Sequence, residues 1–210
     1  MVSPAEPPVA LGLAASQLRR MRRIVDAAAQ LAAEGGFDGV RLRDVAIASD
    51  VALGTLYKYF RSKEDILLFA LTEESQKLEA DVRERPARGA DPALRLTDFF
   101  ARATRGLTRK PGFARAMIRA IAQGDPAMAD KVAGFHLRMG RLIVATLRDE
   151  APAEGDLTRP VGSEREQAVV TMLNHVWFAA LVGWAGGLHP AKTVVDRMRE
   201  ASELLLSPIA

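Results

Sequence analysis

The sequence contains no cysteine among its 210 residues and only three histidines. The lack of cysteine excludes disulfides, thiolate metal sites and cysteine nucleophiles together, and it fits a reducing cytoplasm. The histidines do not have the spacing of metal ligands, and the chain has neither a phosphate-binding loop nor a G-x-S-x-G motif. We therefore expect no metal, no cofactor and no enzymatic activity.

Strand patterns and long uncharged apolar runs are also scarce. The run that comes nearest to a membrane span, residues 168–188, carries Asn174, His175 and three glycines. We expect it to be a buried helix and expect no contact with a membrane. The first fifteen residues contain several prolines and no basic residue, which predicts a disordered tail rather than a signal peptide.

Helical periodicity is present along nearly the whole chain. Apolar residues recur three or four positions apart, which predicts an all-α protein of about nine helices. We expect a tail at 1–15, a three-helix head at 16–61 and a helical body at 62–210. The helices are predicted at about 16–35, 42–49, 53–59, 62–85, 91–109, 111–123, 127–150, 164–186 and 191–206.

Two short helical patterns in the head flank the polar pair Ser49-Asp50. Asp is one of the few residues other than Gly that tolerate a positive φ, so a tight turn is expected at Asp50. Two short helices joined by such a turn are typical of a helix-turn-helix, in which the second helix enters the major groove of DNA.

The distribution of charge agrees with DNA binding. Residues 16–63 hold nine Lys and Arg against five Asp and Glu, whereas residues 64–210 hold twenty of each. The excess positive charge therefore coincides with the helix-turn-helix pattern, where it can meet phosphates.

The strings A-A-x-x-L-A-A-E-G-G-F, R-D-V-A and V-A-L-G-T-L-Y-K-Y-F-R-S-K-E-D-I-L between Ile24 and Leu67 closely resemble the TetR/AcrR family of bacterial transcriptional regulators. The arrangement W-x-x-x-L-x-x-W at Trp177, Leu181 and Trp184 is similar to steroid-catabolism repressors within that family. The resemblance implies a homodimer whose body binds a small effector.

Several positions depart from the family pattern. The family often has Thr at positions 41 and 42, Gly at 50, Ser at 52 and Lys at 53, where this chain has Arg41, Leu42, Asp50, Ala52 and Leu53. Loss of the Ser hydroxyl should cost about 0.5–2 kcal/mol of helix capping. The polar contacts of positions 42 and 53 with DNA are therefore in doubt.

Three residues of the head are candidates for base contacts. Arg43 can offer its guanidinium fork to guanine, although an ion pair with Asp44 or Glu64 is the structural alternative. Leu53 can contact a thymine methyl or simply pack within the head. Gly54 either lets the backbone approach the bases or relaxes the start of the helix.

The candidates for phosphate contacts are Thr55, Tyr57, Lys58, Tyr59 and Lys63. Hydroxyl and ammonium groups at a groove rim position the protein without reading sequence. Lys63 also lies in the first turn of the fourth helix, where free amides favour an anion. Tyr59 is next to Phe60 and could instead be partly core.

The last two helices are the candidates for the dimer interface, because the helix at 164–186 is apolar nearly all round and could serve both a core and a partner. A wholly internal helix is the alternative. The predicted interface residues are Val169, Leu173, Val176, Ala180, Trp184, Val195 and Met198.

Aromatic and Met residues in the middle helices could line a cavity for an apolar ligand, as the resemblance implies, or could simply form core. The predicted lining residues are Phe99, Phe100, Met117, Ile121, Phe135, His136, Met139, Ile143, Asn174, Trp177 and Phe178.

These features together predict a TetR-like repressor in the bacterial cytoplasm. It would bind palindromic double-stranded DNA as a homodimer and be released by a small hydrophobic effector, lipid-like or steroid-like. A DNA-binding regulator controlled by a protein partner remains the alternative, and activation instead of repression is also open.

Overall fold

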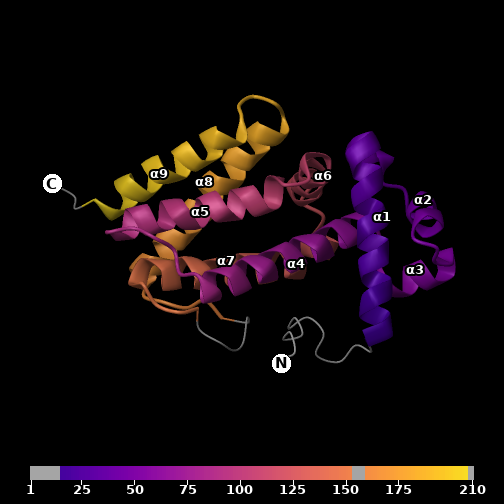
Figure 1. Ribbon diagram of the computed structural model, residues 1–210, viewed down its shortest axis with the longest axis horizontal. Coiled ribbons are helices and arrows are strands. Elements are labelled where there is room, and N and C mark those ends of the chain that lie inside the picture. Colours follow the sequence, from indigo (N-terminus) through magenta and orange to yellow (C-terminus); the bar gives the residue numbers. More distant parts are fainter. Residues whose placement is uncertain (1–14, 153–158, 208–210) are drawn as a thin grey trace. The chain divides into compact units, whose positions relative to one another are not determined.

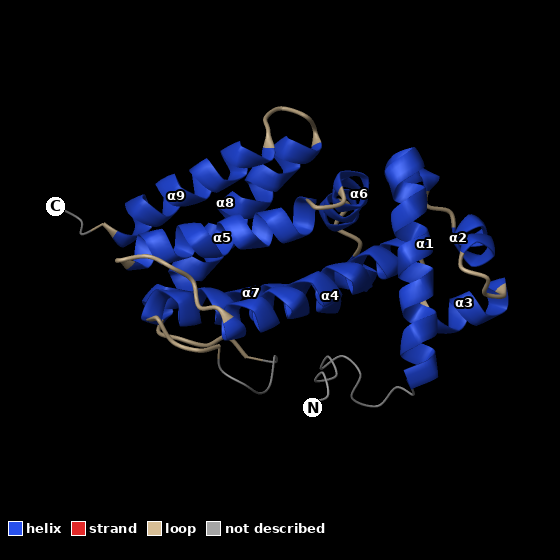
Figure 2. Ribbon diagram, viewed as in Figure 1, coloured by secondary structure: helices blue, strands red, loops and turns tan. Residues whose placement is uncertain are grey.

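The computed structural model describes residues 15–152 and 159–207, so the predicted tail falls almost wholly outside it. Every regular element in these ranges is helical, which confirms the predicted all-α class (Figure 2). The helices are α1 (Ala15–Gly39), α2 (Leu42–Ala48), α3 (Leu53–Tyr59), α4 (Lys63–Glu84), α5 (Pro92–Thr108), α6 (Pro111–Ala122), α7 (Ala129–Arg148), α8 (Glu164–Ala185) and α9 (Ala191–Leu206), with a short 3-10 helix at Pro126–Met128 before α7 (Figure 1).

Local sequence signals set several of these boundaries. Asp91 caps α5, because its side chain accepts a hydrogen bond from the Leu94 amide at 2.9 Å. Gly36 has a φ of 61° and interrupts α1 where the glycine pair predicted a stop. Ala52 provides no side-chain cap for α3, as its missing hydroxyl predicted.

Contacts divide the described residues into two compact units. The first contains the residues up to Gln76 together with Lys110–Met128, and the second contains Lys77–Arg109 and the residues from Ala129 onward. These units are defined by packing, and the first of them includes α6. The division predicted at 61/62 separates a DNA-binding part from a ligand-binding part and stays a prediction.

The first unit is built around α1, which packs against α2 and α6. Gly112 makes the approach of α6 possible, because a Cβ at this position would lie 2.8 Å from the Ala32 carbonyl oxygen. Arg119 of α6 also donates to the Asp38 carboxylate at 2.8 Å. In sequence α6 lies between α5 and α7, which belong to the second unit.

The second unit is a bundle in which α5 packs against α7 and α9, and α8 packs against α7 and α9. Phe99 and Phe100 of α5 are fully buried and meet edge to face, with ring centroids 5.0 Å apart. The Trp177 indole N–H donates to Thr104 Oγ1 at 3.0 Å, which satisfies its polar atom inside the core.

Helix α8 is long and apolar enough to cross a membrane by length and composition, and 39% of its most apolar window is buried. Core helices of soluble proteins meet the same criteria. Its buried face packs against α7 and α9 and carries Trp177, whose indole makes the hydrogen bond to Thr104. The remaining apolar face is exposed.

Three charged residues are buried together in the second unit. Glu79 of α4 is an ion-pair partner of both Arg138 and Arg141 of α7, and the contact to Arg141 Nη2 measures 3.3 Å. All three side chains lie in the interior. The cluster fixes this part of α4 to α7.

The carboxylate of Glu166 stabilises the start of α8. Glu166 accepts hydrogen bonds from Arg148 Nε and Nη2, both at 2.8 Å, and completes a capping box with Ser163. The Arg148 hydrogen bonds, followed by those from the Ser163 backbone and side chain, lower the pKa of Glu166 to about 2.

We expect this lowered pKa to contribute to acid unfolding. The contribution of Glu166 is fully present above the ordinary pKa of about 4.5 and is lost as the pH falls through about 2. Glu166→Gln should therefore reduce the free energy of unfolding at pH 7 by about 0.5–2 kcal/mol, the usual value of a helix cap. Urea titrations at pH 7 and pH 3 measure this difference, which should shrink at the lower pH. An equal deficit at both pH values would contradict the assignment.

Candidate DNA-binding surface and body pocket

The helix-turn-helix is held by buried apolar side chains and one tight turn. Asp50 adopts a φ of 51°, as predicted, and the next amide, that of Val51, donates to the Ala46 carbonyl at 3.0 Å. Val45 of α2 and Leu56 of α3 are fully buried. The two helices therefore form a fixed pair rather than a flexible loop.

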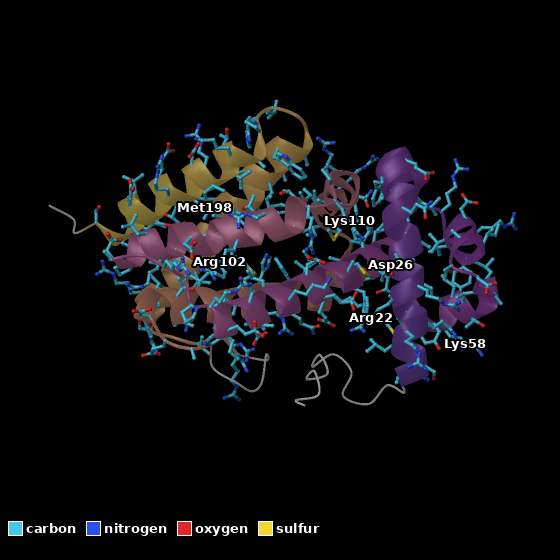
Figure 3. The ribbon with its side chains drawn as sticks, in the orientation of Figure 1. Arg22, Asp26, Lys58, Arg102, Lys110 and Met198 are labelled. Atoms are coloured by element: carbon cyan, nitrogen blue, oxygen red, sulfur yellow. The ribbon has the colours of Figure 1, made fainter. Side chains whose placement is uncertain are left out.

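The outer face of this pair carries most of the predicted DNA-binding residues. Arg43, Gly54, Tyr57 and Lys58 are exposed, and Lys58 projects from α3 into solvent (Figure 3). Arg43 makes no ion pair with Asp44, Glu64 or any other residue that the structure describes, so its guanidinium is available.

Leu53 and Thr55 are half-buried on α3. A Cβ atom added at Gly54 would have no other atom within 4 Å. The space around Gly54 lies outside the protein. Close approach of another molecule to the backbone is therefore possible at the start of α3.

Tyr59 and Lys63 are tied to the first unit. The Tyr59 hydroxyl accepts a hydrogen bond from Arg20 Nη1 at 3.0 Å, which links α3 to α1. Lys63 Nζ donates to the Phe37 carbonyl at 3.2 Å and lies 3.8 Å from the centroid of the Phe37 ring. If either residue contacted a phosphate, its side chain would have to bind the phosphate and its present partner at the same time.

The start of α4 resembles a capping box. The Asp65 amide donates to Ser62 Oγ at 3.2 Å, and the Asp65 carboxylate accepts from the Arg61 amide at 2.9 Å. The carboxylate therefore reaches one residue further back than a standard capping box requires.

A pocket of about 420 Å³ lies in the second unit between α7 and α8, beside residues 160–161. Two of the predicted ligand residues, His136 and Asn174, line it. Burial, and secondly the neighbouring His175, lower the pKa of His136 below its usual value of 6.5, which favours a neutral ring.

The other predicted ligand residues lie away from this pocket. Met117 and Ile121 belong to α6 and thus to the first unit. The rest are packed in the second unit, and four of them have 0% exposure: Phe99, Phe100, Met139 and Ile143. Trp177 is also buried, whereas Phe135 and Phe178 are half-buried.

Most of the predicted dimer residues face the interior of the second unit. The buried ones are Val169, Leu173, Ala180, Trp184 and Met198, while Val176 and Val195 are half-buried. Because α8 is apolar nearly all round, its periodicity could not indicate which face is exposed.

The exposed face of α8 is a separate stripe at spacings of four and three residues, which we call the α8 stripe. Met172 and Val182 are 49% and 41% exposed within it. Such spacing is that of a helix seam that packs on another helix. The members of the stripe are Ala168, Met172, His175, Ala179 and Val182.

Comparison with known proteins assigns the chain to a family. Residues 24–69 match the family model described as bacterial regulatory proteins, tetR family, and residues 89–205 match the tetracyclin repressor-like C-terminal domain. The chain belongs to the TetR family. It is 34% identical to the HTH-type transcriptional repressor KstR of Rhodococcus jostii (strain RHA1) over 191 residues, which cover 91% of this chain and 84% of that protein.

Solved TetR structures have the same fold. A TetR transcriptional regulator from Rhodococcus sp. RHA1 superposes with a TM-score of 0.77 at 24% identity, covering 93% of this chain and all of that one. FadR of Thermus thermophilus, a TetR-family repressor in complex with lauroyl-CoA, gives a TM-score of 0.67 at 23% identity, with 90% and 97% coverage.

Sequence reasoning missed some surface residues of this TetR-family protein. Ile47 of α2 is 75% exposed beside the candidate base-contacting residues. In α8, polar residues recur every three or four positions at Gln167, Thr171 and Asn174, and all three line the pocket. That polar spacing in an otherwise apolar helix was the signal that could have located the pocket.

Proposed function

We propose that this TetR-family protein is a transcriptional repressor that binds a palindromic operator as a homodimer and is released by a small apolar effector. The proposed site of action is the bacterial cytoplasm. The observation that carries the proposal is the exposed, donor-rich face of the α2–α3 pair.

The chemistry of that face fits double-stranded DNA. An α-helix fits the major groove, and the residues at its N-terminal end meet the base edges. Gly54 lies at that end of α3, while Tyr57 and Lys58 lie further along the helix. We therefore assign base reading to Arg43 and the start of α3, and phosphate contacts to Tyr57, Lys58 and Thr55.

Leu53 is half-buried, so it could still contact a thymine methyl or pack within the head. Ile47, which is exposed, is a second candidate for contact with a thymine methyl. Tyr59 and Lys63 are assigned a supporting role, because their existing contacts hold α3 and α4 against the rest of the first unit. Each could contact a phosphate without leaving its present partner.

One head reads too few base pairs for a unique operator. A two-fold dimer presents two heads to half-sites about one helical turn apart. The α8 stripe is the proposed dimer surface, since it is an apolar seam that stays exposed after the second unit has packed.

The pocket between α7 and α8 supports control by an effector over control by a protein partner. Its volume of about 420 Å³ lies within the usual range for small-molecule sites, roughly 300–1,000 Å³. An effector that favours one head spacing over another would shift the dimer away from its operator, and a ~100-fold effect needs about 2.7 kcal/mol of coupling.

The proposal is tested by footprinting the purified protein on the intergenic DNA next to its own gene. A protected inverted repeat with half-sites about 34–36 Å apart is expected. Binding that random competitor DNA removes as efficiently as the repeat, at moderate salt, would refute the proposal.

Two substitutions separate positioning from reading. Lys58→Ala should weaken binding to every duplex and reduce the salt slope by roughly one for each lost phosphate contact. Arg43→Ala should instead relax the preference at one base pair of each half-site, by about 1–3 kcal/mol.

Titrations of operator and single-base variants at several salt concentrations measure both effects. Arg105→Ala is the matched control, because it removes an exposed cation from the second unit. If Arg43→Ala weakened binding to all sequences equally, its role in base reading would be excluded.

A further inference from the structure

The pocket between α7 and α8 contains a buried acceptor that has no donor. Asn174 is 8% exposed, and its carbonyl atom Oδ1 has no hydrogen-bond partner. Buried polar atoms in native proteins are nearly always paired, so an exception requires an explanation. Asn174 also lines the pocket, which indicates that the missing donor comes from a molecule inside it.

The lining of the pocket restricts the chemistry of that molecule. Leu137, Val161 and Val170 provide apolar wall, whereas Gln167 and Thr171 provide uncharged polar groups. No Asp, Glu, Lys or Arg is among the described residues that line it. A carboxylate or phosphate group that entered as far as the buried Asn174 would therefore lose hydration without gaining a counter-charge, so the lining selects against it there.

The polar side chains are not equally available. Thr171 Oγ1 already donates to the Gln167 carbonyl at 2.9 Å, and Gln167 Nε2 donates to the Gly162 carbonyl at 3.1 Å. Both of these bonds use donors, and Asn174 Oδ1 is the one buried side-chain atom without a partner among the described residues that line the pocket; Asn174 is also less exposed than His136 and His175. The ligand end that enters furthest should be the end that carries the donor.

We propose that this pocket binds an uncharged, mainly apolar molecule that bears a hydroxyl group, and that this hydroxyl donates to Asn174 Oδ1. The inference rests on the proposed function, because it names the chemical class of the effector. It favours a lipid-like or steroid-like alcohol over a ketone or hydrocarbon of the same shape, since neither of those can donate to a carbonyl oxygen.

The stability of the empty protein gives a first test. An acceptor kept without a donor destabilises the fold, so Asn174→Leu, which has nearly the same size, should raise the melting temperature in the absence of ligand. Gln30→Leu, which replaces an exposed amide on α1, is the control and should leave the melting temperature unchanged. A clear fall for Asn174→Leu would mean that its oxygen is already satisfied, and it would overturn the proposal.

Ligand selectivity gives the second test, by calorimetry without DNA. The probes are β-naphthol, β-methylnaphthalene and β-naphthoate, which share one ring system and differ in a hydroxyl, a methyl and a carboxylate group. The wild type should bind the naphthol about tenfold more tightly than the methyl compound, the ratio expected for one net hydrogen bond, and should bind the naphthoate most weakly.

In Asn174→Leu the ratio of naphthol to methylnaphthalene affinity should fall to about one, while Gln30→Leu should keep the wild-type ratio. A wild-type ratio near one overturns the inference even if Asn174→Leu does not fold. Operator binding is measured separately on the same preparations. Lost selectivity with intact operator binding removes only this inference, whereas intact selectivity without operator binding removes only the proposed function.

Discussion

Glu79→Gln is expected to lower the free energy of unfolding by about 3–5 kcal/mol. Glu79 lies between Arg138 and Arg141, and the three residues are 9%, 8% and 6% exposed. Removing the carboxylate breaks the ion pairs of two buried guanidinium groups. The amide of glutamine would also direct N–H donors at groups that can only donate.

The loss should appear as a fall in melting temperature of roughly 6–20 °C, since each kcal/mol shifts a domain of this size by about 2–4 °C. Disrupting the exposed pair Lys192–Asp196 is the control and should change stability far less than Glu79→Gln does, because solvent screens the pair. Replacing Glu79, Arg138 and Arg141 together by Met or Leu should recover much of the loss, because the charges of both buried ion pairs are removed at once. If Glu79→Gln had the wild-type free energy of unfolding, the cluster would make no net contribution to stability.

The cluster and the pocket share helix α7 of the second unit. Helix α7 gives His136, Leu137 and Gly140 to the pocket, while Arg138 and Arg141 in the same two turns hold Glu79. A ligand that rotates or shifts α7 must therefore move the Glu79 end of α4 or break the buried ion pairs.

Local signals were enough to predict most of the fold. The start of α5 at Asp91-Pro92, the break of α1 at its glycine pair and the positive φ of Asp50 each depend on neighbours within a few residues. Such features can be found in sequence because the chemistry and the geometry lie in the same short segment. The helix-turn-helix surface was predictable for the same reason.

The ligand and dimer residues depend instead on contacts between distant segments. Glu79 and Arg138 are 59 positions apart, and no local pattern links them. Phe99 and Phe100 have the apolar spacing of both a core and a cavity wall, and only packing decides between the two. Likewise, α8 has apolar residues on every face, so sequence could not separate Leu173, which is buried, from Met172, which is not.

The second large effect is expected on the exposed face of α8, the surface that we propose for the dimer. Ala179→Glu should raise the dimer dissociation constant by about 30-fold to 1,000-fold, as for a central interface residue worth about 2–4 kcal/mol. Ala179 is the fourth of the five residues of the α8 stripe, and a two-fold interface brings each stripe against its own copy. The substitution therefore brings two carboxylates into one apolar seam, where both lose hydration and repel each other.

Sedimentation velocity over a range of protein concentrations measures this change, and Ala80→Glu, at an exposed position of α4, is the matched control. Operator affinity should fall with the dimer, because each released monomer binds only one half-site.

Leu173→Ala gives the opposite pattern for the inward face of the same helix. It leaves a cavity in the core and should cost about 2–5 kcal/mol of stability, with the dimer constant little changed while the protein remains folded. If Leu173→Ala weakened the dimer and Ala179→Glu did not, the interface would have to be placed elsewhere than on the α8 stripe.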